Sequence, residues 1–499
     1  MDRSTRTVRS EHQAQGARPG PASLPLPPHR LRRAVAIVPI ARPLAYAQAH
    51  ASRFCKELMA LIRFPTVSAQ PEHAADLVDC ARWLADHLRG IGLEHAQVSR
   101  TEGHPLVYAD WLHAAGKPTV LIYGHYDVQP ADPLDQWQTP PFQPAIRGLY
   151  LYGRGASDDK GQFFAHLKAI DAYLRTTGSL PTNVKVILEG EEEIGSASLL
   201  AFARQHPEAL AADVAVVSDT SIPAPDRPAL TYALRGSLSL ELEVRGLRGD
   251  VHSGTYGGAV REPLQALCAI LDGLYARGGC ITIRGFYGRV RLPDPDERAY
   301  LVGVGPTNEE ILAGAGASRG WGEPGFTLYE STTLRPSLSV HGISGGYQGP
   351  GIKTVIPAIA AAKLSFRLVP DQEPDEVDRL FRQHIARTIP PGVRCTVRTL
   401  DAARPVVMER GHPALRAAEV AYRRGFGASP VFLRSGGTIP VVSTLQNALG
   451  ISTVLMGLAL ADDAKHGPNE RFYLPNLANG IRTSIYFLVE VGSGVRRHA

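Results

Sequence analysis

The sequence predicts an α/β fold, in which a mainly parallel sheet carries helices on both faces and is interrupted by an inserted ferredoxin-like α+β domain. Two observations predict this architecture. Between residues 118 and 219, short apolar runs alternate with helical segments, which is the rhythm of a parallel sheet. Between residues 234 and 402, apolar residues instead recur at every second position, which is typical of strands with one buried face.

The first part of the chain follows the α/β rhythm closely. Residues 45–89 are mostly helical with a break at Pro65, and the second helix ends at Gly90, as a helix C-terminus should. The segments that follow are predicted, in chain order, as strand, helix, strand, helix and strand: 118–124, 162–178, 183–190, 197–206 and 213–219.

The insertion is predicted from a change of period. In "SLSLELEVRG" (237–246), apolar residues alternate with polar ones, and two further strands and two helices complete a small sandwich. After Ala403 the α/β rhythm returns and ends on a long helix. We therefore expect four parts: a disordered Arg- and Pro-rich tail (1–44), the first part of the larger domain (45–233), the inserted domain (234–402) and the second part of the larger domain (403–499).

The predicted tail contains one apolar run. "AVAIVPIA" (34–41) is too short to span a bilayer and is interrupted by Pro39. Arginines precede this run, so an export signal is an alternative to a disordered or non-native extension. No other segment reaches transmembrane length, and the sequence therefore predicts no membrane partner.

Composition excludes several classes of protein. The chain has 44% hydrophobic and 20% charged residues and a net charge of +5, which suits an ordinary globular protein and gives no case for nucleic-acid binding. Its five cysteines are scattered and form no CxxC pair. They favour reduced thiols in a cytoplasmic protein over a disulfide framework or a cysteine zinc site.

Histidines and carboxylates gather where predicted strands end. Ligands bind outside the carboxyl ends of strands in open parallel sheets, and mixed His and carboxylate ligands suit zinc, with manganese or cobalt as alternatives. A solvated acidic turn at "EGEEEIGS" (189–196) and helix capping by one aspartate of "SDD" (157–159) are the simpler interpretations of single motifs. One metal site explains all five segments together, which supply His125 and Asp127, Asp158, Glu192 and Glu193, Asp219, and His466.

The ordered motifs resemble a two-metal peptidase family that includes carnosine dipeptidases, glutamate-releasing carboxypeptidases, succinyl-diaminopimelate desuccinylase and aminoacylases. The similarity runs from about residue 45 to 490 and is greatest to the dipeptidase branch. One departure is Arg147–Gly148, where many relatives carry Asp-Gly in a loop. The motifs that carry the resemblance are "GHYDVQP", "YGRGASDDKG", "EGEEEIGS", "DVHSGTYGG" and "KHGPNE".

The resemblance implies two divalent metal ions per chain and a role for each residue. His125 and Asp219 would hold one ion, Glu193 and His466 the other, and Asp158 would bridge both. Asp127 would orient His125. Glu192 would act as general base on a water between the ions, whose pKa the metals lower. Glu191 is interpreted as an outward-facing residue without a part in the site.

Two further residues are candidates for substrate contacts. The resemblance implies that His252, in the inserted domain, stabilises the oxyanion and reaches the active site of a partner chain in a homodimer. The simpler interpretation is a structural turn histidine. Arg434, beside a Gly-rich turn, can bind a substrate carboxylate with two hydrogen bonds, and a surface arginine is the alternative.

The sequence thus predicts a metal-dependent hydrolase that cleaves dipeptides or short peptides, as a dipeptidase or carboxypeptidase. An aminoacylase-like deacylase of N-acyl amino acids with the same metal site is one alternative. A non-catalytic binding protein on this fold is another, although it would be expected to have lost a ligand or the base.

Overall fold

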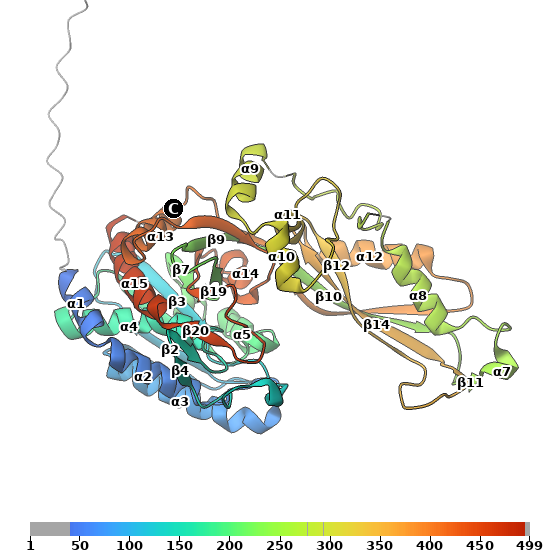
Figure 1. Cartoon of the computed structure of the whole chain (residues 1–499), viewed down its shortest axis with the longest axis horizontal. Coiled ribbons are helices and arrows are strands. Elements are labelled where there is room, and N and C mark those ends of the chain that lie inside the picture. The colour runs from blue at the N-terminus through green and yellow to red at the C-terminus, as the bar shows by residue number, and fades with distance from the viewer. Residues whose placement is uncertain (1–39, 277, 293, 495–499) are drawn as a thin grey trace, which may run out of the picture. The chain divides into compact units, whose positions relative to one another are not determined.

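The computed structural model describes residues 40–276, 278–292 and 294–494, all within one compact unit (38–499) (Figure 1). The predicted tail therefore lies outside the described residues up to position 39. A helix, α1 (Ala41–Ala49), already begins within the last positions assigned to the tail. Within the described ranges, no helix is long and apolar enough to cross a membrane.

A nine-stranded sheet forms the larger domain. Its centre is parallel, because β3 pairs in parallel with β6 and β7, and β18 pairs in parallel with β7, while the strands toward both edges pair mostly antiparallel. The strand order is β1 (Glu94–Ser99), β2 (Leu106–Trp111), β6 (Asn183–Glu189), β3 (Thr119–His125), β7 (Val214–Val217), β18 (Thr453–Met456), β9 (Ala229–Leu234) and β16 (Val406–Val407), with β17 (Val431–Ser435) also on β9.

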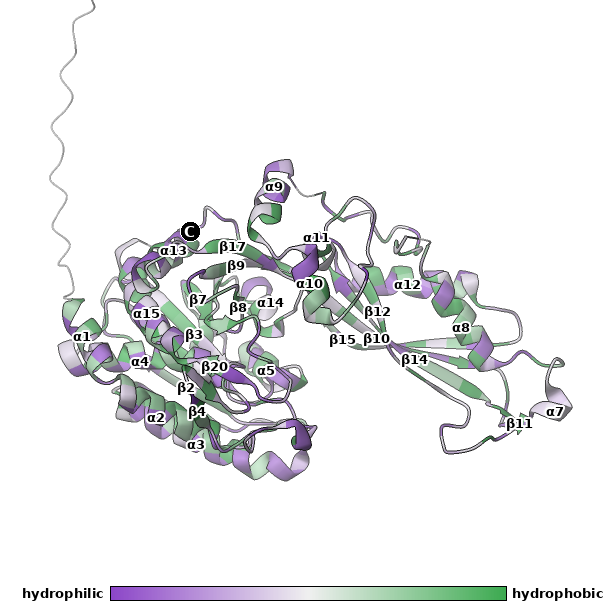
Figure 2. Ribbon diagram, viewed as in Figure 1, coloured by the Kyte–Doolittle hydropathy of each residue, from purple (hydrophilic) through white to green (hydrophobic). Residues whose placement is uncertain are grey.

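Helices cover both faces of this sheet, which confirms the predicted fold class. Alternate residues of β3 show the two faces: Val120 and Ile122 join one core cluster, and Leu121 and Tyr123 join another. The first face packs against α1, α2 (Ala51–Ile62), α3 (Ala74–Gly90), α4 (Lys160–Thr177), α13 (Pro413–Gly425) and α15 (Leu474–Gly494). The second packs against α5 (Ala197–Gln205), α6 (Pro207–Leu210) and α14 (Pro440–Asn447). Figure 2 shows hydrophobic residues concentrated on the central strands and mixed colours on the helices.

Between β9 and β16 the chain builds a separate four-stranded antiparallel sheet. Two helices, α8 (Pro263–Gly273) and α12 (Pro374–Thr388), bury their apolar residues on one of its faces. A short strand, β11 (Val251–His252), and a short helix, α7 (Ser253–Tyr256), follow β10 along the chain. β11 pairs with β13 (Val355–Ile356), which directly precedes β14. The strand order is β12 (Ser337–Gly345), β14 (Ile359–Leu368), β10 (Gly236–Arg245) and β15 (Arg394–Ala403).

One part of the insertion packs on the larger domain. Leu301, Tyr329 and Leu334 belong to the same core cluster as the central sheet. The Tyr329 hydroxyl also donates a hydrogen bond of 2.8 Å to the Arg434 carbonyl of β17. This part of the insertion contains three helices that the sequence did not indicate. They are α9 (Pro295–Val304), α10 (Asn308–Ala315) and α11 (Leu328–Thr333).

Smaller elements complete the described part. A three-stranded sheet joins β4 (Ala145–Arg147), β5 (Tyr150–Tyr152) and β20 (Arg471–Tyr473), and a two-stranded one joins β8 (Ser221–Ile222) to β19 (Ala459–Leu460). Short 3₁₀ turns are η1 (Pro71–His73), η2 (Leu134–Gln136) and η3 (Glu192–Ile194).

Candidate metal centre

Three adjacent parallel strands deliver the first candidate ligands. β3 ends at His125, directly beside Glu189 at the end of β6, and Asp219 follows the end of β7. The parallel pairing sets all three strand ends at the same edge of the sheet. Each strand is buried along its length, so the charged groups at these ends are shielded from water.

Asp158 lies between two histidines that come from the two parts of the larger domain, on either side of the insertion. Its Oδ1 is 3.1 Å from His125 Nε2, and its Oδ2 is 3.0 Å from His466 Nε2. Two groups of potential ligand atoms share Asp158, and within each group the atoms lie within 4.8 Å of one another: His125, Asp158 and Asp219, and Asp158, Glu193 and His466.

Asp127 connects the two ligand-bearing segments. Its Oδ1 accepts a hydrogen bond from the Glu192 N–H, and its Oδ2 accepts one from the Glu193 N–H, each at 3.1 Å. Oδ1 lies 3.5 Å from His125 Nδ1, whose hydrogen-bond partner at 3.1 Å is the Asp127 carbonyl. Ser68 donates a further bond of 2.7 Å to Oδ2. Asp127 therefore holds the His125 ring through its backbone carbonyl and the turn of the two glutamates through its carboxylate.

Burial disfavours the charged form of three carboxylates in this cluster. Burial, and to a smaller extent Asp158, raise the pKa of Glu193 to about 7. Burial raises the pKa of Glu192 well above its ordinary value, opposed by His125 and reinforced by Asp219. Burial and Asp158 also raise the pKa of Asp219. In the protein without bound cations, these groups therefore retain protons at a higher pH than free carboxylates do.

Lys465, which sequence reasoning missed, supplies positive charge to the same cluster. Its Nζ lies 3.5 Å from Asp219 Oδ1. Although burial opposes ionisation of Asp158, Lys465 and the two histidines lower the pKa of that carboxyl well below its ordinary value. The position of Lys465, next to His466 in "KHGPNE", was the available signal.

The donor set fits divalent cations. Glu193 Oε1 is buried and accepts no hydrogen bond within the described part of the chain; its nearest charged neighbour is His466 Nε2 at 3.5 Å, while Gln129 donates to its Oε2 at 2.7 Å. A buried carboxylate oxygen without a hydrogen bond is costly unless a cation lies beside it. Imidazole nitrogens and carboxylate oxygens without thiolates are the ligands that hydrolytic zinc, manganese or cobalt sites use.

The interpretation of Glu191 as outward-facing is wrong. Its side chain is buried, and its two oxygens accept hydrogen bonds from the His104 N–H at 2.6 Å and the Ser198 N–H at 2.8 Å. The carboxylate thus accepts hydrogen bonds from two backbone N–H groups, one in the first turn of α5 and one in the loop before β2. Three consecutive glutamates have three different surroundings, which their sequence spacing alone did not reveal.

Arg434 borders a cavity that also contains Asp219. The cavity has a volume of about 420 Å³, and Lys465 and the turn at 435–438 contribute to its wall. The Arg434 guanidinium is already paired: its Nη2 lies 2.5 Å from Glu297 Oε1, and its Nε donates to the Tyr232 hydroxyl at 3.0 Å. The guanidinium therefore lines the same cavity as the candidate ligand Asp219 but is paired with an internal carboxylate.

His252 is not part of this cluster. It ends the short strand β11, is exposed, and has one side-chain hydrogen-bond partner among the described residues, Thr255 Oγ1 at 3.4 Å from its Nδ1. The two ligand groups around Asp158 do not include it. Seven predicted residues thus meet at the end of the central sheet, namely His125, Asp127, Asp158, Glu192, Glu193, Asp219 and His466.

Comparisons with known proteins identify the class. A model of the peptidase family M20/M25/M40 matches residues 121–490. The Cys-Gly metallodipeptidase dug1 of Schizosaccharomyces pombe is 32% identical, over 88% of this chain and 96% of its own length. The human Beta-Ala-His dipeptidase is 30% identical, over 89% of this chain and 91% of its own.

Solved structures agree with the sequence comparison. The M20 family metallo-carboxypeptidase Sso-CP2 from Sulfolobus solfataricus is 31% identical, with a TM-score of 0.81, over 88% of this chain and 99% of that one. The chain belongs to peptidase family M20/M25/M40. The resemblance stated from the motifs is therefore confirmed, and the chain is an enzyme of this peptidase class.

Proposed function

We propose that this protein is a metal-dependent dipeptidase, which hydrolyses the amide bond of dipeptides or short peptides. The observation that carries the proposal is the position of Asp158. Its two oxygens lie 3.1 Å from His125 Nε2 and 3.0 Å from His466 Nε2. Each of these histidines belongs to a group of potential ligands that contains a further carboxylate. A carboxylate with a separate partner for each oxygen suits a bridge between two cations.

Two divalent ions would be held by this chain's own side chains. His125, Asp158 and Asp219 would hold one ion, and Asp158, Glu193 and His466 the other. Zinc is the proposed ion, with manganese or cobalt as alternatives. When bound, the ions supply positive charge that acidifies a coordinated water and polarises the substrate carbonyl.

Glu192 is the proposed general base. Its backbone N–H is held by Asp127, which orients the side chain beside the cluster without making it one of the potential metal ligands. Burial and the neighbouring Asp219 raise the pKa of Glu192, so its carboxylate is a stronger base than a free one, which suits accepting a proton from water and passing it to the leaving amine.

The substrate class is inferred from relatives and from the cavity. The S. pombe and human relatives are named as dipeptidases, and the Sulfolobus structure as a carboxypeptidase. The substrates of both activities carry a free C-terminal carboxylate. Arg434, which lines the cavity that contains Asp219, would bind this carboxylate in place of its internal partner Glu297. Deacylation of N-acyl amino acids is the second candidate, because such substrates carry the same carboxylate.

A hydrolysis screen tests this function. Metal-loaded protein is incubated with dipeptides, longer peptides and N-acyl amino acids, and the released amines are quantified. We expect the highest kcat/KM for dipeptides. Preference for N-acyl amino acids would replace the proposed substrate class, and no hydrolysis by protein that carries metal would refute the proposal.

We further propose that the enzyme works as a homodimer through the inserted domain, in the cytoplasm. The proposal of a dimer rests on His252, which the motif assigns to catalysis although it lies outside the ligand cluster. The proposal of a cytoplasmic location rests on the five cysteines, which are free thiols in the described chain.

A further inference from the structure

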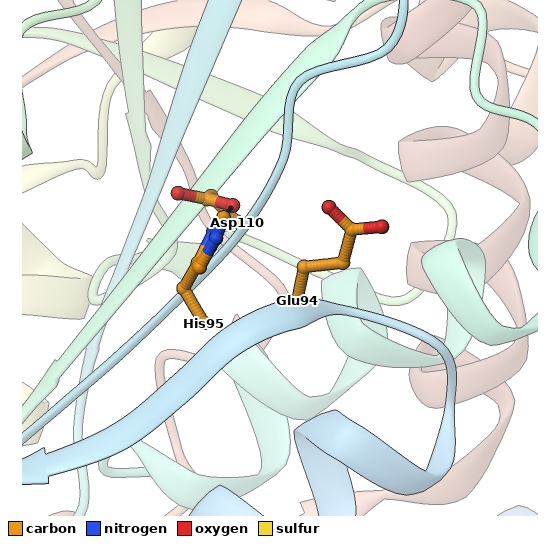
Figure 3. Close-up of side chains that lie close together, drawn as sticks. All are labelled: Glu94, His95 and Asp110. Atoms are coloured by element: carbon orange, nitrogen blue, oxygen red, sulfur yellow. Dashed lines mark hydrogen bonds and ion pairs between the residues drawn. The ribbon is translucent and has the colours of Figure 1, made fainter.

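A third group of metal-ligand side chains lies on the hairpin of β1 and β2 (Figure 3). One ligand atom each of Glu94, His95 and Asp110 lies within 4.8 Å of the other two. Asp110 aligns with Lys185, near the start of β6, whereas His125 of the dinuclear cluster aligns with Glu189 at the end of that strand. We propose that Glu94, His95 and Asp110 bind one divalent transition-metal ion at a site separate from the catalytic centre.

The strand pairing places like charges against each other at this site. Glu94 and Asp110 are direct cross-strand partners, an arrangement in which two carboxylates repel each other. A bulge between Glu94 and Gln97 interrupts the register, and His95 within it adopts a positive φ of 50°. The His95 imidazole is directed at Asp110, with its Nδ1 2.8 Å from Asp110 Oδ1, and the Glu94 carboxylate stands to one side of this pair (Figure 3). A cation held by all three groups would remove the repulsion.

Asp110 is the fixed ligand of the three. Its side chain is 8% exposed, and the Tyr108 hydroxyl donates to its Oδ2 at 2.9 Å, which leaves Oδ1 directed at His95. Hydrogen bonds of this kind orient ligating carboxylates in metal sites. The His95 side chain is 71% exposed, so an ion can enter from solvent while Asp110 remains in place.

A second imidazole stands beside Glu94 and would orient it. His113 Nε2 lies 2.9 Å from Glu94 Oε2, and the His113 ring packs edge-on against Trp111. One imidazole and two carboxylates without a thiolate suit Zn²⁺, Co²⁺, Ni²⁺ or Cu²⁺ rather than Ca²⁺ or Mg²⁺. A tetrahedral zinc ion with bonds of about 2.1 Å holds its ligand atoms about 3.4 Å apart, a spacing that rotation of the exposed Glu94 and His95 side chains can reach.

The site would stabilise the edge of the central sheet. β1 is the terminal strand of the nine-stranded sheet and has one neighbour, β2. An ion bound by Glu94 and His95 of β1 and by Asp110 of β2 would join the edge strand to its neighbour at the bulge, where the register is broken. The expected effect is on stability and not on the catalytic reaction.

The test counts bound metal in the full-length protein. After equilibrium dialysis against excess Zn²⁺, we expect wild-type protein to retain one ion more per chain than His95→Asn and Asp110→Asn variants. Asparagine tolerates the positive φ at position 95 and removes the imidazole. His206→Asn is the matched control, because His206 is also exposed and paired with a carboxylate, Glu208, at 3.7 Å. It should retain the wild-type count.

A second measurement separates this site from the catalytic centre. In an Asp158→Ala background, which removes the shared ligand of the dinuclear cluster, Co²⁺ titration followed by visible absorption should give one equivalent. That equivalent should disappear when His95→Asn is added. If Asp158→Ala does not fold, the comparison of wild type with His95→Asn decides alone. Equal metal binding with and without His95 overturns the proposal.

Discussion

The nine-stranded and four-stranded sheets bury their side chains in different ways. In β3, every residue from Val120 to His125 is buried, whereas burial alternates along β10, and most residues of β15 are exposed. Charged groups at the ends of the central strands therefore meet little water, while polar groups on the four-stranded sheet remain solvated. The difference explains why a carboxylate cluster at the central sheet needs a cation and why exposed polar residues of the insertion do not.

Two predicted site histidines, the candidate metal ligand His125 and the candidate catalytic residue His252, show the same contrast. The side chain of His125 is 0% exposed and has a carboxylate near each ring nitrogen. His252 lies exposed at the end of a two-residue strand. The surroundings of His125 are complete within one chain, but the proposed role of His252 needs a second surface to cover it.

Replacing the proposed base should have the largest effect on turnover. We expect Glu192→Gln to lower kcat by about 10²–10⁴-fold, the usual contribution of a general base, while the metal content stays at the wild-type level. Kinetics and metal analysis of the same preparation measure both. Loss of metal in this variant would mean that Glu192 and Glu193 have exchanged roles.

The neighbouring glutamate provides the matched control. Glu191→Gln makes the same chemical change, but Glu191 holds the backbone of His104 and Ser198. It should lower the stability to unfolding by up to about 1.5–3 kcal/mol, the contribution of hydrogen bonds to a charged group, with kcat retained. A large loss of kcat in Glu191→Gln would remove the distinction between the two positions.

The inserted domain is tested by complementation. His252→Ala should lower kcat by about 10²–10³-fold if the imidazole stabilises the oxyanion. If it acts across a two-fold interface, a mixed dimer with Glu192→Gln has one site with both lesions and one with neither. Mixing the two inactive variants should then restore about half of the wild-type activity per mixed dimer. If verified mixed dimers stay inactive, His252 acts on the active site of its own chain or has no part in catalysis.

Arg434 should affect substrate binding more than turnover. Loss of a charge-assisted contact worth about 1.5–3 kcal/mol should lower kcat/KM in Arg434→Ala by roughly 10- to 100-fold for dipeptides with a free carboxylate. Dipeptide amides should be much less affected. Glu297→Gln, which weakens the internal partner, should retain the preference for a carboxylate. Equal losses for acid and amide substrates would assign Arg434 a structural role.

A further prediction concerns stability alone, at a buried histidine beside the cluster. His166 contacts Ser218 Oγ at 2.7 Å and Ser484 Oγ at 2.9 Å, and burial lowers its pKa to about 4. Its folded pKa is below the ordinary value, so the stability it contributes is present above about pH 6.5 and is lost as the pH falls toward 4.

Denaturant unfolding of the metal-free protein measures this contribution. From pH 6.5 to 4, the unfolded chain binds a proton that the folded chain excludes, which costs up to about 1.4 kcal/mol of unfolding free energy per pH unit. His166→Gln lacks this titration, so its stability should fall less steeply with acid. Identical slopes for both proteins would contradict the assignment.

The fold class and the ligand cluster could be predicted because both depend on local pattern. The ends of β3 and β7 place His125 and Asp219, and the start of α4 places Asp158, without any knowledge of the loops between them. β1 escaped prediction because "EHAQVS" has few apolar residues and pairs across a bulge, so that its contacts are set by register. β2, "LVYADW", was also missed although it is an apolar and fully buried run. The three helices between Pro295 and Thr333 escaped because they bury residues on a distant part of the chain.

Contacts between segments far apart in sequence were the least predictable. Glu191 differs from Glu192 only in what its side chain meets, namely backbone N–H groups of residues 104 and 198. The pairing of Arg434 with Glu297 joins positions separated by most of the insertion. Such pairs leave no periodic pattern in the sequence, because many carboxylates of the chain are equally able to pair with a given guanidinium and only the fold selects one.

Metal content of an Asp158 variant tests the central claim most directly. Asp158 is the one side chain shared by both ligand groups, so Asp158→Ala should remove two ions per chain relative to wild-type protein prepared in parallel. Elemental analysis after gel filtration at limiting Zn²⁺ gives the difference, and circular dichroism verifies that the variant is folded. A folded variant that retains the wild-type metal content would contradict the bridge and, with it, the proposed two-metal site.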